Sequence, residues 1–284
     1  MEPIKRAIPM RDGVKLYTEV VEHGAKYWLI ASHGIGEHLG RHKYLKEVFG
    51  FDVNVFQYDL RGHGRSGGEK AYIDPFDQFM EDLKDIIQYL KTNYKMEGYI
   101  LYGHSMGALI TCGFVQNYLG DDIENLRAMI VNAPPVGVGG PLGKFVNKVK
   151  SGFFNKLANI KMSVPLGGLV DLNTLSHRNQ VIEEFNNDPL NHKKLHTKLL
   201  LEMVASSKKI FSRRINDKVE KYISYGTGDT LISVPELEKY LKEVDPSFTV
   251  RTIEGARHEQ YQEIEKYRVP YFNYLRDLVK SLIF

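Results

Sequence analysis

A short stretch near the middle of the chain, Gly103-His104-Ser105-Met106-Gly107, constrains the fold more than any other part of the sequence. Residues 99–102 before it are apolar and aromatic, as in a buried strand, and residues 108–119 after it are apolar on almost every side, as in a buried helix. A strand that enters a helix with almost no loop needs a tight turn, in which Ser105 takes strained backbone angles and its neighbouring glycines leave room. The stretch therefore predicts a nucleophilic serine held clear of a sheet; a glycine-rich turn with an ordinary serine is the alternative.

The elements on either side of this turn alternate between strand and helix. Before it, the sequence predicts an opening hairpin around Asp12-Gly13, followed by strands at 28–32 and 53–58 and an amphipathic helix at 75–94. After it, the sequence predicts a strand at 128–133, a strand at 222–225, a helix at 235–244, a strand at 248–253 and a last helix from about 259 to 283. This alternation predicts an α/β fold with a mostly parallel central sheet and helices on both faces.

The alternation stops after Pro135. A stretch rich in glycine and proline follows, and we find no further strand signal until residue 222. Residues 136–215 are helical in character, which predicts a helical cap inserted into the core. We therefore expect a first part of the core at 1–135, the cap at 136–215 and a second part of the core at 216–284.

Composition limits the classes of protein that this chain could be. Its 284 residues suit one large domain with an insertion, and a formal net charge of +3 is too small to indicate nucleic acid as a partner. The single cysteine, Cys112, excludes an intrachain disulfide and a cysteine-based metal cluster. We see neither a signal peptide nor a run of apolar residues long enough to span a membrane, and so expect a cytoplasmic protein. The sequence does not indicate an oligomeric state.

A serine nucleophile needs a base, and the base needs an acid that orients it. With a turn of this kind the chain order is serine, acid, histidine, and the partners lie in loops after later strands. Asp229 follows the strand at 222–225, and His258 follows the strand at 248–253. Every other histidine lies earlier in the chain, so His258 is the one candidate for the base. Asp229 could instead cap a turn. We predict Ser105, Asp229 and His258 as catalytic residues.

The oxyanion of the reaction needs two backbone N–H donors. One belongs to Met106, directly after the serine, and the other to the loop after the strand at 28–32, where we choose Ile35 and keep its neighbour Gly34 as the alternative. Glu37 and Arg41, four residues apart, could brace this loop, or could form a solvated surface pair.

Two other patterns do not predict a ligand site. The glycine-rich stretch 62–68 lacks the lysine and spacing of a phosphate-binding loop and is better explained as a structural turn. The early histidines have no carboxylate or cysteine at metal-ligand spacing; they are His33, His38, His42 and His63. We expect neither a metal nor a cofactor.

The chain resembles the monoacylglycerol lipase-like serine hydrolases, a branch of the α/β-hydrolases that includes lysophospholipases and serine aminopeptidase-like proteins. The matching stretches are His33-Gly34-Ile35-Gly36-Glu37-His38, residues 58–66, residues 103–107, Gly226 to Asp229, Gly255 to His258 and, in the cap, Asn186-Asn187-Asp188-Pro189-Leu190. The resemblance covers nearly the whole chain but is thin from about 137 to 175. It implies the same catalytic residues and the same oxyanion donors, Ile35 and Met106. The chain departs from the family at Ile35, where the animal enzymes carry a small residue, and at Ala108, where a second glycine is common.

The resulting expectation is a carboxylic ester hydrolase that acts through an acyl-enzyme on Ser105, with a small ester or lipid such as monoacylglycerol or a lysophospholipid as substrate. A serine aminopeptidase is the nearest alternative, and its amine-binding carboxylate would come from Glu183, Glu184 or Asp188. A binding protein without catalysis is the lower alternative, because such proteins often lack a catalytic residue and this chain lacks none.

The start of the cap suggests contact with a lipid surface. Residues 141–162 carry five lysines and no acidic residue, with apolar residues between them at roughly helical spacing. This pattern suits a surface helix that meets anionic headgroups and lines an acyl channel. An apolar face packed on the core with solvated lysines explains it equally well.

Overall fold

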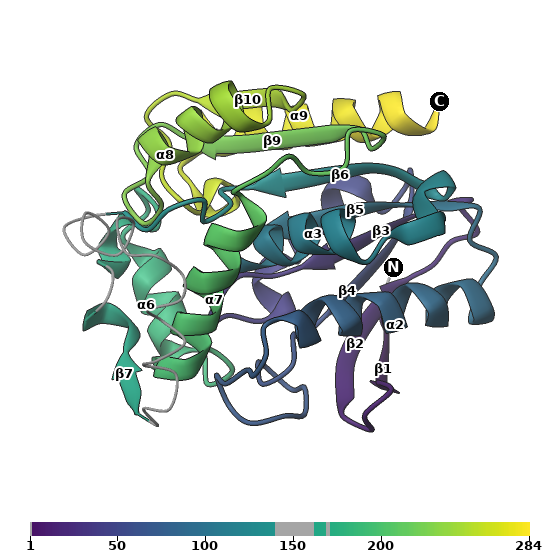
Figure 1. Ribbon diagram of the computed structural model, residues 1–284, viewed down its shortest axis with the longest axis horizontal. Coiled ribbons are helices and arrows are strands. Elements are labelled where there is room, and N and C mark those ends of the chain that lie inside the picture. Colours follow the sequence, from purple (N-terminus) through teal and green to yellow (C-terminus); the bar gives the residue numbers. More distant parts are fainter. Residues whose placement is uncertain (1, 140–161, 169–170) are drawn as a thin grey trace.

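The computed structural model describes residues 2–139, 162–168 and 171–284, and its centre is an eight-stranded sheet (Figure 1). The strand order is β1-β2-β4-β3-β5-β6-β9-β10, and all neighbouring pairs are parallel except β1 with β2 and β2 with β4. The strands are β1 (Ile4–Pro9), β2 (Lys15–Val21), β3 (Tyr27–Ser32), β4 (Asn54–Tyr58), β5 (Gly98–His104), β6 (Leu126–Asn132), β9 (Lys221–Gly226) and β10 (Thr249–Ile253). The predicted α/β fold is confirmed, and β1 and β2 form the predicted opening hairpin.

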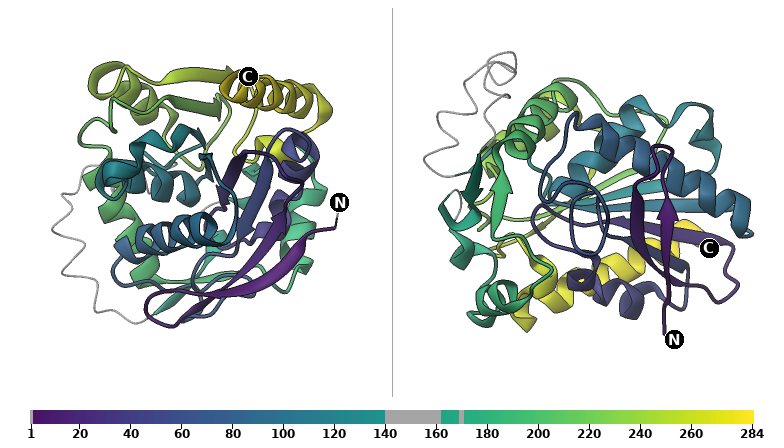
Figure 2. Two further views of the ribbon diagram at one scale, coloured as in Figure 1. Left: turned by 90° about the vertical axis from the view of Figure 1, so that its right-hand side faces the viewer. Right: turned by 90° about the horizontal axis from the view of Figure 1, so that it is seen from below.

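Helices cover both faces of this sheet (Figure 2). One face packs against α2 (Asp77–Asn93), α3 (Met106–Asn117), α7 (Thr197–Ile210) and α8 (Val234–Lys239), and the other against α1 (Tyr44–Phe49) and α9 (Glu265–Ile283). Along β3, Trp28 and Ile30 enter the first apolar core, and Leu29 and Ala31 enter the second. Alternate residues of a strand point to opposite faces, so a strand that is apolar at every position requires cover on both sides.

The segment between β6 and β9 lies beside the carboxyl ends of these strands (Figure 1). It contains α6 (Gln180–Asn187), α7, short 3₁₀ turns at Leu166–Gly168 and Leu172–Thr174, and an antiparallel pair of strands, β7 (Ser163–Pro165) with β8 (Lys194–His196). The expectation that no strand lies between residue 135 and residue 222 was therefore wrong. Each of these strands has three residues, which is too short for an alternating pattern to be recognised. The proposed boundaries of the cap stay a prediction.

Two predicted helices have different bounds in the structure. The helix expected at 235–244 is α-helical only over α8 and continues as a π turn at Tyr240–Val244. The last helix starts at Glu265, after a 3₁₀ turn at Gln260–Gln262, and not near 259. Directly before that turn, the buried side chains of His258 and Glu259 line the pocket described below. Further 3₁₀ turns occupy Leu39–His42 and Gly120–Glu124.

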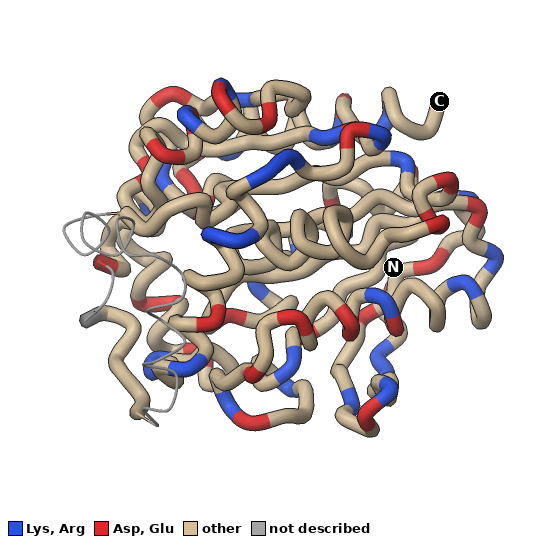
Figure 3. The backbone as a smooth tube through the Cα atoms, in the orientation of Figure 1, with Lys and Arg blue, Asp and Glu red and all other residues tan. Residues whose placement is uncertain are grey.

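Charged residues of both signs are interspersed along the described backbone (Figure 3). None of the helices in the described ranges combines the length and apolarity needed to cross a membrane.

Candidate active site

Ser105 occupies the strained turn that the sequence predicted. It joins β5 to α3 with φ 52° and ψ −117°, a conformation that residues with a side chain rarely adopt. Its N–H donates to the Asn132 carbonyl at 2.9 Å, which ties the turn to the end of β6. A Cβ on Gly107 would lie 2.1 Å from the Ser32 carbonyl oxygen, so only glycine allows α3 to approach β3 this closely.

Asp229 and His258 form a buried pair. His258 Nδ1 lies 2.7 Å from Asp229 Oδ2, while Asp229 Oδ1 accepts hydrogen bonds from the backbone N–H groups of Leu231 at 2.8 Å and Ile232 at 3.3 Å. Because the carboxylate only accepts, we assign the proton to Nδ1 and leave Nε2 as the free acceptor. Burial disfavours the charged ring, but the Asp229 carboxylate, together with Glu259 and Glu37, outweighs burial and raises the pKa of His258 above its ordinary value. The pair can thus hold the imidazole in the tautomer that a general base needs.

The loop after β3 distinguishes the two candidate oxyanion donors. Gly34 N–H donates to Glu37 Oε1 at 2.5 Å and is therefore already engaged. Within the described ranges, no acceptor is bonded to the N–H of Ile35 or of Met106. The loop lies against the serine, since a Cβ on Gly34 would be 3.3 Å from Ser105 Cβ. This geometry favours Ile35 over Gly34.

Glu37 and Arg41 are buried, which rules out a solvated surface pair. Arg41 Nε donates to Glu37 Oε2 at 3.1 Å, and the side chains are 6% and 4% exposed. Glu37 also accepts from His42 Nε2 at 2.8 Å and from Tyr261 Oη at 3.1 Å. Burial opposes its ionisation, but the hydrogen bond from His42 and electrostatic attraction, including that of the Arg41 guanidinium, hold the pKa of Glu37 well below its usual range.

Two residues of this network were missed by the sequence analysis. Glu259 accepts from Arg41 Nη2 at 2.5 Å, and Tyr261 reaches Glu37 from the same turn. They lie more than two hundred positions from their partners, and no local pattern indicates such a contact. Their only signal was their position within three residues after His258.

A second polar layer supports the base. The His104 ring lies 5.0 Å from the His258 ring, and His104 Nδ1 bonds Asn132 Oδ1 at 2.7 Å. Asn132 in turn donates to Ser224 Oγ at 3.0 Å and to Gln260 Oε1 at 2.9 Å. Burial, together with repulsion from His258, lowers the pKa of His104 well below its usual value. His104 therefore stays neutral beside the base.

The other early histidines hold loops together. His33 Nδ1 bonds the Gly34 carbonyl at 2.8 Å, and its Nε2 accepts from Leu60 N–H at 2.9 Å. His38 Nε2 bonds Asp188 Oδ2 at 2.8 Å, and His63 Nδ1 bonds the carbonyl of Arg61 at 3.0 Å.

A pocket of about 260 Å³ is lined by three of the five predicted site residues. At its polar end lie Ser105, His258 and Ile35. Its other described walls are mainly aliphatic, namely Val138, Leu166, Leu172, Leu175, Leu195, Leu200, Leu201, Met203, Val204, Leu231 and Ile232. The acidic side chains among the described lining residues are Glu37 and Glu259, and both bond Arg41. The pocket thus offers an apolar channel that ends at a serine and a histidine.

The carboxylates considered for a peptidase lie outside this lining. Asp188 bonds His38, Glu184 pairs with Arg178 at 3.0 Å, and Glu183 is exposed on α6.

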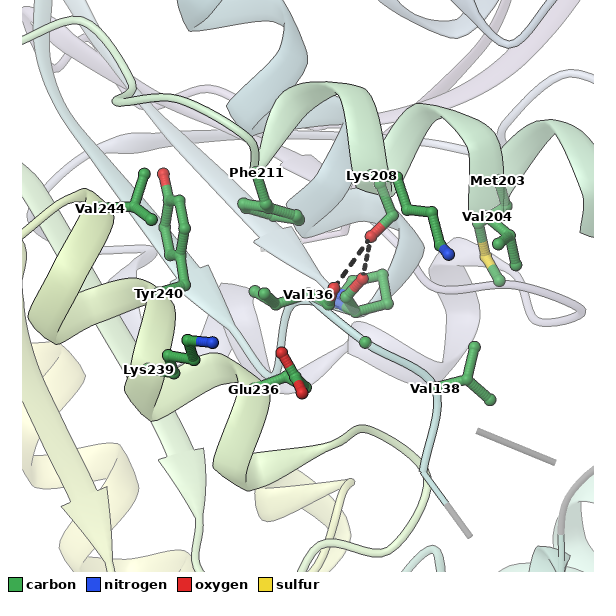
Figure 4. Close-up of a pocket in the computed structure, with 13 residues that line it drawn as sticks. Val136, Val138, Met203, Val204, Lys208, Phe211, Glu236, Lys239, Tyr240 and Val244 are labelled. Atoms are coloured by element: carbon green, nitrogen blue, oxygen red, sulfur yellow. Dashed lines mark hydrogen bonds between the residues drawn. The ribbon is translucent and has the colours of Figure 1, made fainter. Parts of the chain in front are cut away.

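A second pocket, of about 220 Å³, lies between α7 and α8 with the adjoining π turn (Figure 4). It shares Val138, Met203 and Val204 with the first pocket, but Ser105 and His258 are not part of its described lining. Lys208 of α7 and Phe211, directly after α7, line it.

A mostly parallel sheet with a serine on a strained turn between strand and helix defines the α/β-hydrolases, and the chain is a serine hydrolase of this class. The family described as "Serine aminopeptidase, S33" matches residues 24–265, which is most of the chain. The chain therefore belongs to this family, and the resemblance predicted from the sequence is confirmed.

Individual proteins are similar over most of their length. A "Monoglyceride lipase homolog" of Monkeypox virus is 28% identical over 255 residues, which cover 85% of this chain and 88% of the viral protein. A "Monoacylglycerol lipase" of Mycolicibacterium smegmatis is 24% identical over 241 residues, covering 84% and 83% of the two chains. A soluble variant of monoglyceride lipase from Saccharomyces cerevisiae, crystallised with a substrate analog, aligns with a TM-score of 0.81 at 18% identity, covering 100% of this chain and 97% of the yeast protein. At that identity the likeness shows the shared fold alone.

Proposed function

We propose that the protein hydrolyses carboxylic esters of a small alcohol through an acyl-enzyme on Ser105. His258 Nε2 takes the hydroxyl proton as Oγ attacks the ester carbonyl, and Asp229 stabilises the imidazolium that forms. The N–H groups of Ile35 and Met106 bind the oxyanion. His258 then protonates the leaving alcohol, and a water that it activates releases the acid.

One observation carries this proposal: His258, which is hydrogen-bonded to the buried Asp229, lines the same apolar pocket as Ser105. An imidazole with its proton held on Nδ1 leaves Nε2 to accept the serine proton. The pair, the serine and the two unbonded N–H groups together supply each part that acyl transfer needs.

The walls of the pocket support a lipid ester as substrate, with monoacylglycerol as our specific choice. The apolar channel suits an acyl chain of medium or long length, and the polar end leaves room for a small hydroxylated alcohol. The names of the viral and mycobacterial relatives agree with this choice.

The family description raises an aminopeptidase as the second candidate. An aminopeptidase needs a free carboxylate to hold the substrate's amine, and the two carboxylates in the described lining are already bonded to Arg41. The ester hydrolase is therefore the better supported function.

The two candidates separate in one assay. Purified protein is given 1-monoacylglycerols of increasing chain length, p-nitrophenyl esters and aminoacyl p-nitroanilides, with a catalytically dead Ser105→Ala variant as control. We expect turnover of the esters, greatest with monoacylglycerol, and none of the anilides. Turnover of the anilides alone would reverse the choice.

We also propose that residues 141–162 dock the protein on anionic lipid surfaces. The support is the sequence pattern of lysines and apolar residues. Residues 141–161 lie outside the described residues, and Met162 is 57% exposed.

A further inference from the structure

A single buried arginine connects the two loops that carry the proposed oxyanion donor and the proposed base. Arg41 Nε reaches Glu37, and Nη2 reaches Glu259, whose side chain is 5% exposed. Glu37 holds the N–H of Gly34, directly before Ile35. Glu259 directly follows His258.

We infer, building on the proposed function, that Arg41 is a positioning residue of the reaction, which fixes the Ile35 N–H relative to the His258 imidazole. The planar guanidinium donates along two fixed directions, and each direction ends at a carboxylate of a different loop. A shift of either loop by about 1 Å would misalign the donor or the base, which is enough to cost about 10²-fold in rate.

Arg41 also offsets the negative charge of the two glutamates near His258. Glu37 and Glu259 both line the pocket, and their negative charges favour the protonated form of His258. The titratable groups that face the His258 ring are Asp229, Glu259, Glu37 and His104. Arg41 is the cation bonded to both glutamates, so its removal strengthens the negative field at the ring.

A matched control exists elsewhere in the fold. Arg61 is another buried arginine between two carboxylates, with Nη2 2.6 Å from Asp82 and Nη1 2.5 Å from Asp12, and its side chain is 9% exposed. It does not belong to the described lining of the substrate pocket. Its loss also leaves a buried carboxylate, Asp82, without its arginine, but neither Asp82 nor Asp12 is among the groups that shift the pKa of His258.

The experiment measures kcat and KM for p-nitrophenyl butyrate against pH in four variants: Arg41→Gln, Arg41→Lys, Glu259→Gln and Arg61→Gln. Circular dichroism and Tm establish that each variant is folded. We expect Arg41→Gln to lower kcat about 10²-fold and to move the acid limb of kcat/KM up by about one pH unit. Arg41→Lys keeps the positive charge but loses the planar guanidinium that bonds both carboxylates. We therefore expect kcat to fall while the acid limb of kcat/KM stays at the same pH.

Glu259→Gln should move the limb in the opposite direction, to lower pH, because it removes a negative charge beside the base. This variant also decides the inference if Arg41→Gln does not fold. Arg61→Gln should lower Tm and leave both the limb and kcat unchanged.

The inference would be overturned, while the proposed function stands, by a folded Arg41→Gln protein with wild-type kcat and acid limb, or by an equal shift of the limb in Arg61→Gln. An unmoved limb in Glu259→Gln would also overturn it. If wild type itself does not hydrolyse the ester, the proposed function fails, and the inference fails with it.

Discussion

Replacing Asp229 with asparagine changes the tautomer of the base without changing the shape of the site. Asp229 Oδ1 accepts two backbone N–H groups, from Leu231 at 2.8 Å and from Ile232 at 3.3 Å. The asparagine carbonyl must occupy that place, because an amide NH₂ there would leave buried donors unpaired at about 1–3 kcal/mol each. Its NH₂ group then faces His258 Nδ1, which has to become an acceptor.

An imidazole that accepts at Nδ1 carries its proton on Nε2, where it can no longer take the proton of Ser105. We expect kcat to fall about 10⁴-fold, equal to about 5 kcal/mol of lost transition-state stabilisation. Tm should change little, since the side chain keeps its size and its backbone hydrogen bonds. Steady-state hydrolysis of p-nitrophenyl butyrate, with Tm measured on the same samples, checks both parts.

Two other aspartates in this part of the chain serve as controls. Asp245 pairs with Lys221 at 3.0 Å, with side chains 0% and 1% exposed, so Asp245→Asn should cost about 3–5 kcal/mol of stability and leave kcat of the folded protein unchanged. Asp217 is 55% exposed, and its replacement by asparagine should affect neither stability nor kcat. An Asp229→Asn protein within tenfold of wild type, or an equal loss of kcat at Asp217 or Asp245, would refute the assignment of the acid.

Three further predictions use simpler perturbations. Ser105→Ala should lower kcat by about 10⁴–10⁶-fold with an unchanged circular dichroism spectrum; activity within tenfold of wild type would refute the assignment of Ser105 as the nucleophile. Because His258 acts as a neutral base and its pKa is raised, kcat/KM should fall as the pH drops through a midpoint above about 6.5; a pH–rate profile with a midpoint below that value would contradict the pairing with the carboxylate. Replacing Lys144, Lys148 and Lys150 together with glutamate should weaken co-sedimentation with anionic vesicles and spare turnover of a soluble short-chain ester, whereas undiminished co-sedimentation would show that these lysines are only a solvated face.

The parts of the fold that the sequence predicted are those encoded by local patterns. The apolar residues before Ser105 and the glycine at 107 specify a strand, a turn and a helix within about 20 positions, and the structure places them there. The loops that carry Asp229 and His258 could be found because each directly follows a strand. Whether these residues act together stays a prediction until it is measured.

The interactions that surround these residues could not be predicted in the same way. Glu37 and Arg41 are one helical turn apart, so their pairing was foreseeable, but their burial depends on Glu259 and Tyr261, which arrive from the far end of the chain. Likewise, the buried turn at Gln260–Gln262 delays the start of the last helix, and no periodicity in residues 259–264 indicates it. Cytoplasmic location stays a prediction from the sequence.

An acyl-enzyme mechanism requires Ser105 to be the nucleophile. The reaction of purified protein with a fluorophosphonate probe, followed by mass spectrometry of the intact protein and of its peptides, tests this requirement. We expect one adduct per chain, located on Ser105, together with the loss of ester turnover in proportion to labelling and no adduct in Ser105→Ala. An adduct on another residue, or full labelling with undiminished turnover, would contradict it.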